Sequence, residues 1–425
     1  MRKWYSLYDK IGTERNLWRA WKRVEANDGA PGCDGQTVQH FGGDARGHLR
    51  QMRQELRANT YRPRPVRRKM IEKTGGGERA LGIPCIRDRI VQVAVAQVLE
   101  PIYAPQFSRV SQGFRPGKGC QTALAIVDQA LRYGYTWVVE LDIRKFFDTV
   151  DHEVVLATIA EQVVDGSVLH LLRALLRSGV MIDPGDEPDP TELGTPQGGP
   201  LSPLLANIYL HTFDIAMQSQ RIPLVRYADD VVKFATSRQE AEAQVASARL
   251  VLEGPLKLTL HPTKTRVVSV DEGVAFLGFR YARDKKGRLQ KEVRAEALAR
   301  FHTRICQLTP RNAGQRWRPM RKITPAWVRR HRRLRATMRK MNTYLRGWIA
   351  YFRDACTSWN WGQDLDQFIR RRRRSLAAGR FANGVWHQLM PNAQFAELGL
   401  YSLAKGYLMA HQGRLDALCI GTHQA

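Results

Sequence analysis

The stretch from Leu224 to Phe234 constrains the fold of this chain most, because it places two adjacent carboxylates between two apolar runs. Short apolar runs on either side of a turn are typical of a β-hairpin, whose tip here would carry Asp229 and Asp230. Aspartate is disfavoured inside a strand and favoured in a turn, where its side chain bonds nearby backbone amides. The stretch therefore predicts an acidic hairpin, and the simplest interpretation of its tip is a solvated turn.

A second interpretation of the acidic tip is a metal site. Two carboxylates side by side repel each other and raise each other's pKa unless cations neutralise them. Two Mg²⁺ ions about 3.5–4 Å apart would do so, and such a pair activates an attacking hydroxyl and stabilises the leaving oxygens of a phosphate. The mechanism generally needs a third carboxylate, so this interpretation requires another acid elsewhere in the chain.

Asp142 is the candidate for the third carboxylate. It ends a β-rich stretch that begins at Thr136, which would place it at the end of a sheet strand. The turn that follows, over 143–148, has free amides and two aromatic residues, and a metal-bound triphosphate would fit there. The alternative is that Asp142 caps the next helix, but Asp148 or Asp151 would serve that purpose as well. Asp142 is thus left without a structural role.

Two glycine-rich segments are candidate nucleotide contacts. Residues 61–84 predict a basic hairpin with a glycine triplet at its turn, and Lys73 and Arg79 flank the triplet, so both can point at one polyphosphate. A flexible surface loop is the alternative. Residues 194–203 hold three glycines and three prolines and predict a rigid loop that opens a buried helix. Gln197 in this loop has a neutral donor and acceptor that suit the sugar and base of a nucleotide.

The charge of the chain indicates its class of partner. The chain has 425 residues, 43% of them hydrophobic, and a formal net charge of +27. A uniform field of that size repels itself without a polyanion, so nucleic acid is the expected partner. A basic membrane-surface protein is the competing class, but the chain has no apolar run long enough to span a bilayer. Its first residues have no apolar signal core, so we expect a cytoplasmic location and no membrane partner.

Residues 311–374 concentrate the positive charge, with 19 Lys or Arg against three Asp, and aromatic residues are interleaved with them. Apolar residues at helical spacing predict a small helical bundle whose outer face binds a nucleic-acid backbone. The run from Arg370 to Arg374 is either a solvated helix end or a phosphate contact. The apolar positions are Met341, Leu345, Trp348, Ile349 and Phe352.

The remaining patterns predict secondary structure. The helix expected over 14–26 has a basic side that is either solvated or in contact with phosphate. Pro101 is expected to stop a core helix that begins at Asp88. Further expected features are a helix from about Gln121, a helical tract from Glu153 to about Ser178, a helix capped by Ser237, a strand over 256–260, an apolar packing turn over 276–279 and a change of composition near residue 290.

Seven short motifs follow one another along the chain: Gly29–Gly35, Gly113–Gly117, Leu141–Asp148, Gly194–Gly199, Tyr227–Asp230, Phe276–Phe279 and Tyr344–Phe352. In this order they resemble a bacterial group II intron reverse transcriptase and maturase, over most of the chain. The chain looks most similar to the compact class C type, which ends in a small DNA-binding domain without a nuclease. His387, His411 and His423 have no cysteine pairs nearby, so the C-terminal nuclease of many relatives is expected to be missing.

The resemblance implies roles for the residues at matching positions. Asp142, Asp229 and Asp230 would hold two Mg²⁺ ions, with help from the Ile143 carbonyl. Phe147 would be the steric gate against a ribose 2′-OH. The implied contacts of the incoming nucleotide are Lys73, Arg79, the amides of Lys145 and Phe146, and Gln197. The implied nucleic-acid contacts are Arg115, which would steady the template, Lys264, Arg346, Arg370, Arg371, Arg372, Arg373 and Arg374.

The predicted fold is α+β, a right-hand polymerase with basic fingers, a palm sheet that bears the three aspartates and an α-helical thumb. We expect fingers and palm over 1–290, with an N-terminal extension over about 1–35, a thumb or maturase domain over 291–375, and a small helical DNA-binding domain over 376–425. The expected reaction is attack of a DNA primer 3′-OH on the α-phosphate of a dNTP, templated by RNA. The resemblance adds group II intron RNA and target DNA as partners, through splicing assistance and reinsertion of the intron into DNA (retrohoming).

Two other functions stay open at this point. A non-enzymatic RNA-binding splicing factor would keep the fold without polymerisation, but a pure binder has no use for repelling carboxylates on a positive surface. A related reverse transcriptase recruited to phage defence or DNA repair would keep the chemistry without an intron. Whether a group II intron RNA is encoded beside the gene would distinguish this last alternative.

Overall fold

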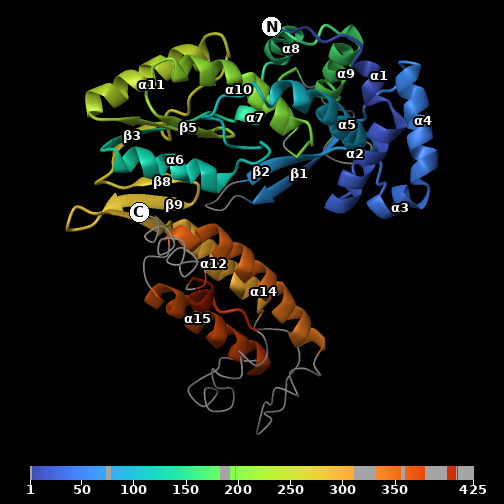
Figure 1. Cartoon of the computed structure of the whole chain (residues 1–425). Coiled ribbons are helices and arrows are strands. Elements are labelled where there is room, and N and C mark those ends of the chain that lie inside the picture. The colour runs from blue at the N-terminus through green and yellow to red at the C-terminus, as the bar shows by residue number, and fades with distance from the viewer. Residues whose placement is uncertain are drawn as a thin grey trace, which may run out of the picture. The chain divides into compact units, whose positions relative to one another are not determined.

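The computed structural model describes residues 2–72, 78–181, 192–196, 198–310, 332–355, 359–378, 400–407 and 409. The chain forms two compact units, Met1–Ser269 and Val270–Ala425 (Figure 1). Both units contain helices and strands, and the α+β class predicted from the sequence is confirmed. Within the described ranges, no helix combines the length and apolar character needed to cross a membrane.

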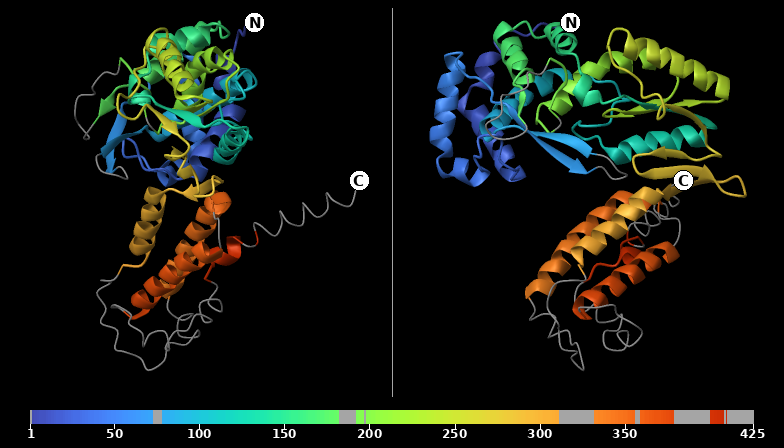
Figure 2. Two further views of the ribbon diagram at one scale, coloured as in Figure 1. Left: turned by 90° about the vertical axis from the view of Figure 1, so that its left-hand side faces the viewer. Right: turned by 180° about the vertical axis from the view of Figure 1, so that it is seen from behind.

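A four-stranded antiparallel sheet forms the centre of the first unit. Its strands are β3 (Trp137–Asp142), β5 (Leu224–Tyr227), β6 (Asp230–Ala235) and β7 (Arg266–Ser269), in the order β5-β6-β3-β7. Consecutive residues of the two central strands, such as Val138 and Val139, are buried, because helices cover the sheet. Helix α11 (Arg238–Glu253) packs on β3 and β6, and α6 (Cys120–Arg132) packs against β5 on the other side of the sheet (Figures 1 and 2).

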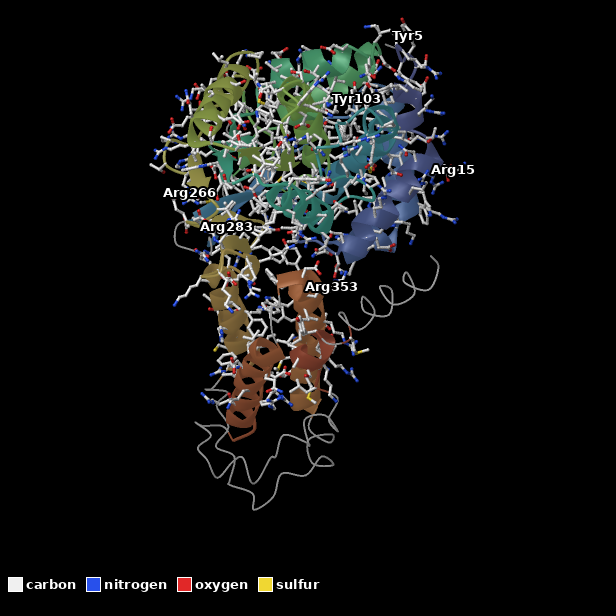
Figure 3. The ribbon with its side chains drawn as sticks, turned by 60° about the vertical axis from the view of Figure 1, so that its left-hand side comes forward. Tyr5, Arg15, Tyr103, Arg266, Arg283 and Arg353 are labelled. Carbon is white, nitrogen blue, oxygen red and sulfur yellow. The ribbon has the colours of Figure 1, made fainter. Side chains whose placement is uncertain are left out.

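The predicted basic hairpin and a group of helices form the other half of this unit. Helix α2 buries Leu17 and Trp21 and packs against α5, whereas Arg15 lies on its outer face and Tyr103 lies inside the unit (Figure 3). The elements are α1 (Tyr8–Ile11), α2 (Glu14–Asn27), α3 (Val38–Gly43), α4 (Ala45–Arg57), α5 (Ile86–Tyr103), the antiparallel pair β1 (Val66–Glu72) and β2 (Glu78–Ile83), and β4 (Val180–Met181), which pairs with β1 in parallel.

The prediction that Pro101 stops helix α5 was wrong. The helix begins at Ile86 and continues to Tyr103. Pro101 lies in the last turn, and the amide of Ala104 still donates to the carbonyl of Glu100 beyond it. A proline in the final turn removes one backbone donor without a long helical segment after it to disrupt.

The single helical tract predicted from Glu153 to Ser178 is two helices, α8 (His152–Ala160) and α9 (Gly166–Leu176). The break follows from Asp165, whose side chain accepts hydrogen bonds from the amides of Ser167 and Val168 and so begins a new helix. Helix α10 (Ser202–Gln218) follows the predicted rigid loop, and α11 begins at the predicted Ser237 cap.

The second unit contains a β-meander followed by helices. Its elements are β8 (Val274–Phe276), β9 (Phe279–Arg283), β10 (Leu289–Val293), α12 (Ala295–Leu308), α14 (Arg332–Phe352), η1 (Arg353–Ala355) and α15 (Trp359–Ala378). The apolar turn before β9 packs as predicted: the Phe279 and Phe352 ring centroids lie 5.1 Å apart, and the Tyr351 hydroxyl donates to the Leu277 carbonyl at 2.9 Å. All five apolar positions predicted along α14 are buried.

Candidate catalytic site and nucleic-acid contacts

Sheet register brings the predicted carboxylates together. Asp142, the last residue of β3, lies directly opposite Asp230, the first residue of β6. Directly opposed residues of an antiparallel pair have Cα atoms about 4.5–5.5 Å apart. Ala228 and Asp229 form the two-residue turn between β5 and β6, so Asp229 directly precedes Asp230. Ala228 has a φ of 58°. Three acids from segments far apart in the chain therefore meet at one end of the sheet.

The electrostatics of this site favour a bound cation. Partial loss of hydration and repulsion from Asp229 and Asp142 raise the pKa of Asp230 to about 6, although its side chain still reaches solvent. The ammonium of Lys264 lies 3.6 Å from a carboxylate oxygen of Asp142 and supplies positive charge there. The predicted contact of Lys264 with nucleic acid stays a prediction.

The donor set at this end of the sheet suits Mg²⁺. Asp142, Asp229 and Asp230 offer only oxygen, which is what this ion prefers, and Ile143 follows directly with its backbone carbonyl. In the described ranges no three His, Cys, Asp or Glu side chains converge tightly enough to enclose an ion as they stand. The chemistry of these residues fits the ion.

Ile143 also corrects one predicted element. The segment 256–260 was expected to be a strand, but its described pairing is a single isolated bridge between Leu260 and Ile143. The amide of Arg144 donates to the carbonyl of Thr259 at 2.9 Å. The segment therefore follows the turn after β3 and anchors it without extending the sheet.

A buried ion pair beneath the acidic turn was missed by the sequence analysis. The Arg226 guanidinium and the Asp214 carboxylate have no exposed surface and form two hydrogen bonds of 2.7 and 2.6 Å. Arg226 also donates to the carbonyl of Ala228 at 2.9 Å, within the turn that carries Asp229. The sequence feature that could have revealed this pair is an arginine inside an apolar strand, because a buried positive charge needs a buried partner of opposite charge.

The same network connects the turn to the Gly113–Gly117 motif. Asn207 accepts from Arg226 at 3.1 Å and donates to the Gly113 carbonyl at 3.0 Å. A Cβ on Gly113 would lie 2.5 Å from the backbone nitrogen of Ala228. Only glycine permits this close approach, and the Gly113–Gly117 motif therefore packs directly against the backbone of the acidic turn.

Arg115 has a structural role that the sequence did not predict. Its guanidinium donates to three backbone carbonyls, those of Ser108, Ser111 and Ala104, at 2.6, 2.9 and 3.2 Å. Because these bonds occupy both terminal nitrogens, the predicted template contact of Arg115 is not supported by its geometry. The arginine holds the loop between α5 and α6 in place.

Phe147 lies at a small cavity between the β1–β2 hairpin and the loop that precedes α10. The cavity has a volume of about 160 Å³, and its lining includes Phe147, Gly82, Gly194 and Pro196. The loop is fixed beside Phe147 because the amide of Thr195 donates to the Phe147 carbonyl at 2.7 Å. This places the predicted steric gate next to the hairpin that carries Arg79.

The other predicted nucleotide contacts are only partly described. Lys73 and Gln197 lie outside the described residues, and Arg79 is described by its backbone alone, opposite Ile71 in the hairpin. Lys145 has a φ of 48° and precedes the short helix α7 (Phe146–Thr149). The Phe146 ring is buried, and the contact of its amide with a nucleotide stays a prediction.

The arginine run of α15 does not form one phosphate-binding face. Arg372 and Arg373 are 5% and 1% exposed, so their predicted nucleic-acid contact is wrong. Arg372 donates to Thr309 Oγ1 at 3.1 Å and to the Thr309 carbonyl at 2.5 Å, and it thereby joins α15 to the end of α12. Arg371 is exposed and Arg370 is half-buried; the Arg374 side chain lies outside the described residues.

Arg346 remains a candidate nucleic-acid contact. It is exposed on α14, and its guanidinium carbon lies 5.6 Å from the centroid of the Tyr401 ring. The three histidines that entered the prediction about a nuclease lie outside the described residues.

The chain is similar in sequence to known proteins. The family described as reverse transcriptase (RNA-dependent DNA polymerase) matches residues 71–281, and the group II intron maturase-specific domain matches residues 316–390. Protein YkfC of Escherichia coli is 34% identical over 293 residues, which are 60% of this chain and 76% of YkfC. The group II intron-encoded protein LtrA of Lactococcus lactis is 39% identical over 198 residues, which are 46% of this chain and 32% of LtrA. A solved structure, the partial Cas6-RT-Cas1–Cas2 complex, has 26% identity and a TM-score of 0.37 and covers 59% of this chain and 43% of that chain.

A palm-like sheet with paired carboxylates, in a chain that matches the reverse transcriptase family, defines an RNA-directed DNA polymerase. The maturase-specific domain follows it in the same chain. The chain belongs to the family of bacterial group II intron-encoded reverse transcriptases and maturases, which confirms the resemblance of its motifs. Reverse transcriptases generally use divalent metal ions.

Proposed function

We propose that Asp142, Asp229 and Asp230 hold two Mg²⁺ ions during DNA synthesis on an RNA template. The observation that carries this proposal is the register that places Asp142 opposite Asp230, beside the turn with Asp229. Bound there, the ions would lower the pKa of the primer hydroxyl and neutralise the developing charge on phosphate. The primer 3′-oxygen bonds to the α-phosphorus of a dNTP, and pyrophosphate leaves. The residues of this chain position the reacting groups.

The test of this proposal is primer extension on an RNA template with dNTPs. We expect extension that requires Mg²⁺, stops on chelation and returns when Mg²⁺ is restored. Extension that persists in the presence of excess chelator would contradict the two-ion site. Ca²⁺ in place of Mg²⁺ serves as a control for simple charge neutralisation, because it prefers longer bonds and a different geometry.

We propose that the nucleotide lies between the β1–β2 hairpin and the turn after β3. The amides of Lys145 and Phe146 lie beneath the triphosphate, Lys73 and Arg79 hold it from the hairpin, and Gln197 contacts the sugar and base. Support comes from the position of Phe147 at the cavity that the hairpin also lines. In this arrangement the Phe147 ring lies where a ribose 2′-OH would collide with it.

Replacing Phe147 with alanine is expected to admit ribonucleotides. The discrimination between dNTP and rNTP, measured as the ratio of their kcat/KM values, should fall about tenfold or more, because the ring no longer blocks the 2′-OH. Tyr133→Ala is the control, since it removes an aromatic ring from an exposed position just after α6. Unchanged discrimination in Phe147→Ala would remove this residue from the role of gate.

We propose that the second unit binds group II intron RNA and that this binding assists splicing and retrohoming into target DNA. Support comes from the maturase-specific domain over 316–390 and from the concentration of positive charge over 311–374. This proposal includes three functional domains, over 1–290, 291–375 and 376–425, and a cytoplasmic location. Sequencing of the RNA that copurifies with the protein tests it, and the absence of intron RNA would favour a role in defence or repair.

Two double variants of α15 separate phosphate binding from packing. We expect Arg370→Gln with Arg371→Gln to reduce the slope of log K for RNA binding against log salt by about 1–2, because each phosphate contact contributes roughly 0.7–0.9. Arg372→Gln with Arg373→Gln should leave that slope unchanged and should lower the thermal midpoint, because their side chains are buried. The opposite pattern would show that the buried pair reaches phosphate when RNA binds.

A further inference from the structure

Two cysteines far apart in the sequence face each other in the first unit. The Cys33 and Cys85 sulfurs lie 3.4 Å apart, although 52 positions separate them in the chain. Cys33 belongs to the loop between α2 and α3, and Cys85 directly precedes α5. Both are free thiols in this structure. A disulfide bond is about 2.05 Å long, so the sulfurs need to approach by only about 1.4 Å, which side-chain rotation can supply.

The backbones around the two cysteines are held in contact by other interactions. A Cβ on Gly32 would lie 2.6 Å from the Cys85 Cα, so the two chain segments pack with no side chain between them. Arg67 donates to the Pro31 carbonyl at 2.7 Å, and Arg89 donates to the Ala30 carbonyl. Because these contacts fix the loop independently of the thiols, closing a disulfide needs little backbone movement.

The two thiols differ in access. Cys33 is half-buried and donates a hydrogen bond to the carbonyl of Pro65 at 3.1 Å. Cys85 has no exposed surface, and burial raises the pKa of its thiol. An oxidant from solvent therefore meets Cys33 first, and Cys85 is placed to resolve the product.

We propose that Cys33 and Cys85 form a redox-sensitive modification site that closes to a disulfide with a low-molecular-weight disulfide such as oxidised glutathione. The Cys33 thiolate attacks one sulfur of the oxidant, its S–S bond breaks, and the first glutathione thiolate leaves. The Cys85 thiol then loses its proton as its sulfur attacks the Cys33 sulfur, and the second glutathione leaves as a thiolate that takes up a proton. Two protein thiols lose two electrons and two protons, and one glutathione disulfide becomes two glutathione molecules.

The disulfide would join the 29–35 loop to the start of α5. The loop also contacts the approach to the β1–β2 hairpin, because Arg64 pairs with Asp34 at 2.9 Å and Cys33 bonds Pro65. Oxidation therefore fixes the base of the hairpin that is proposed to hold the triphosphate. The formation of the bond itself does not depend on the proposed nucleotide site.

The test treats the full chain with oxidised glutathione and maps its peptides by mass spectrometry without reduction. We expect a peptide that links Cys33 to Cys85, loss of both free thiols and a thermal midpoint several degrees higher that dithiothreitol reverses. Both cysteines remaining free, or crosslinks to other cysteines at the same rate, would overturn the proposal.

Variants test the order of the steps. Cys85→Ser should stop at the mixed disulfide, with one glutathionyl group on Cys33, and Cys33→Ser should leave Cys85 unmodified because it is buried. Cys120→Ser is the matched control and should form the Cys33–Cys85 link at the rate of the unaltered protein. Equal modification of Cys85 in Cys33→Ser would overturn the assignment of Cys33 as the entry point.

Discussion

Asp229→Asn is expected to lower the rate of primer extension about a thousand-fold, a loss of about 4 kcal/mol of transition-state stabilisation. The change keeps the shape of the side chain and removes one negative charge from a metal ligand. The site would then hold the paired ions too weakly to align the primer hydroxyl with the α-phosphate. The measurement is single-turnover extension of a DNA primer on an RNA template at saturating dNTP and Mg²⁺.

A surface carboxylate provides the control for this loss. Glu242→Gln removes the same charge from an exposed position on α11, where Glu242 pairs with Arg238, and should extend primers at the normal rate. RNA binding should not weaken in either variant, because each change removes one negative charge and takes no positive charge from the surface that binds RNA. A small loss of activity in Asp229→Asn would show that this carboxylate does not hold an ion during the reaction.

Arg226→Met is expected to have the largest effect on stability, lowering the free energy of unfolding by about 3–5 kcal/mol. Both side chains of the Arg226–Asp214 pair have no exposed surface, so removal of the guanidinium leaves a buried carboxylate without its ion pair. Asn207 and the Ala228 carbonyl lose the same donor. Urea unfolding of the variant and the unaltered protein measures the difference.

A second variant separates stability from positioning of the acidic turn. Arg226→Met combined with Asp214→Leu removes both charges, and its free energy of unfolding should return to within about 2 kcal/mol of the unaltered protein. The Ala228 carbonyl still lacks its donor, so we expect kcat for primer extension to remain at least about tenfold low while the KM for the RNA–primer duplex is unchanged. Full recovery of kcat in the double variant would show that the network acts through stability alone.

The acidic hairpin could be predicted because its signals are local. Apolar runs, a turn and two aspartates lie within eleven residues, and the structure forms β5, the turn and β6 from them. The prediction that Pro101 ends helix α5 was wrong because its outcome depends on more than local signals. The effect of Pro101 depends on how many helical turns follow it, which the surrounding packing of α5 decides.

Charge runs were the weakest source of prediction. Successive residues of a helix project in different directions, and among the described arginines of the α15 run Arg372 and Arg373 are buried whereas Arg371 is exposed. The run of arginines does not indicate which face of α15 packs against the other helices. Arg226 shows the same limit, because a lone arginine in a strand indicates a buried partner without naming Asp214.

Sequence by itself determined the class of fold, the acidic hairpin, the apolar face of α14 and the family, because these depend on short-range periodicity, turn chemistry and ordered motifs. Only the tertiary structure decided that Asp142 lies opposite Asp230, that Arg226 supports the turn, that Arg372 and Arg373 are buried, and that Cys33 meets Cys85. These contacts join residues far apart in the chain. Their pairing follows from sheet register and from the closure of long loops, which no local pattern encodes.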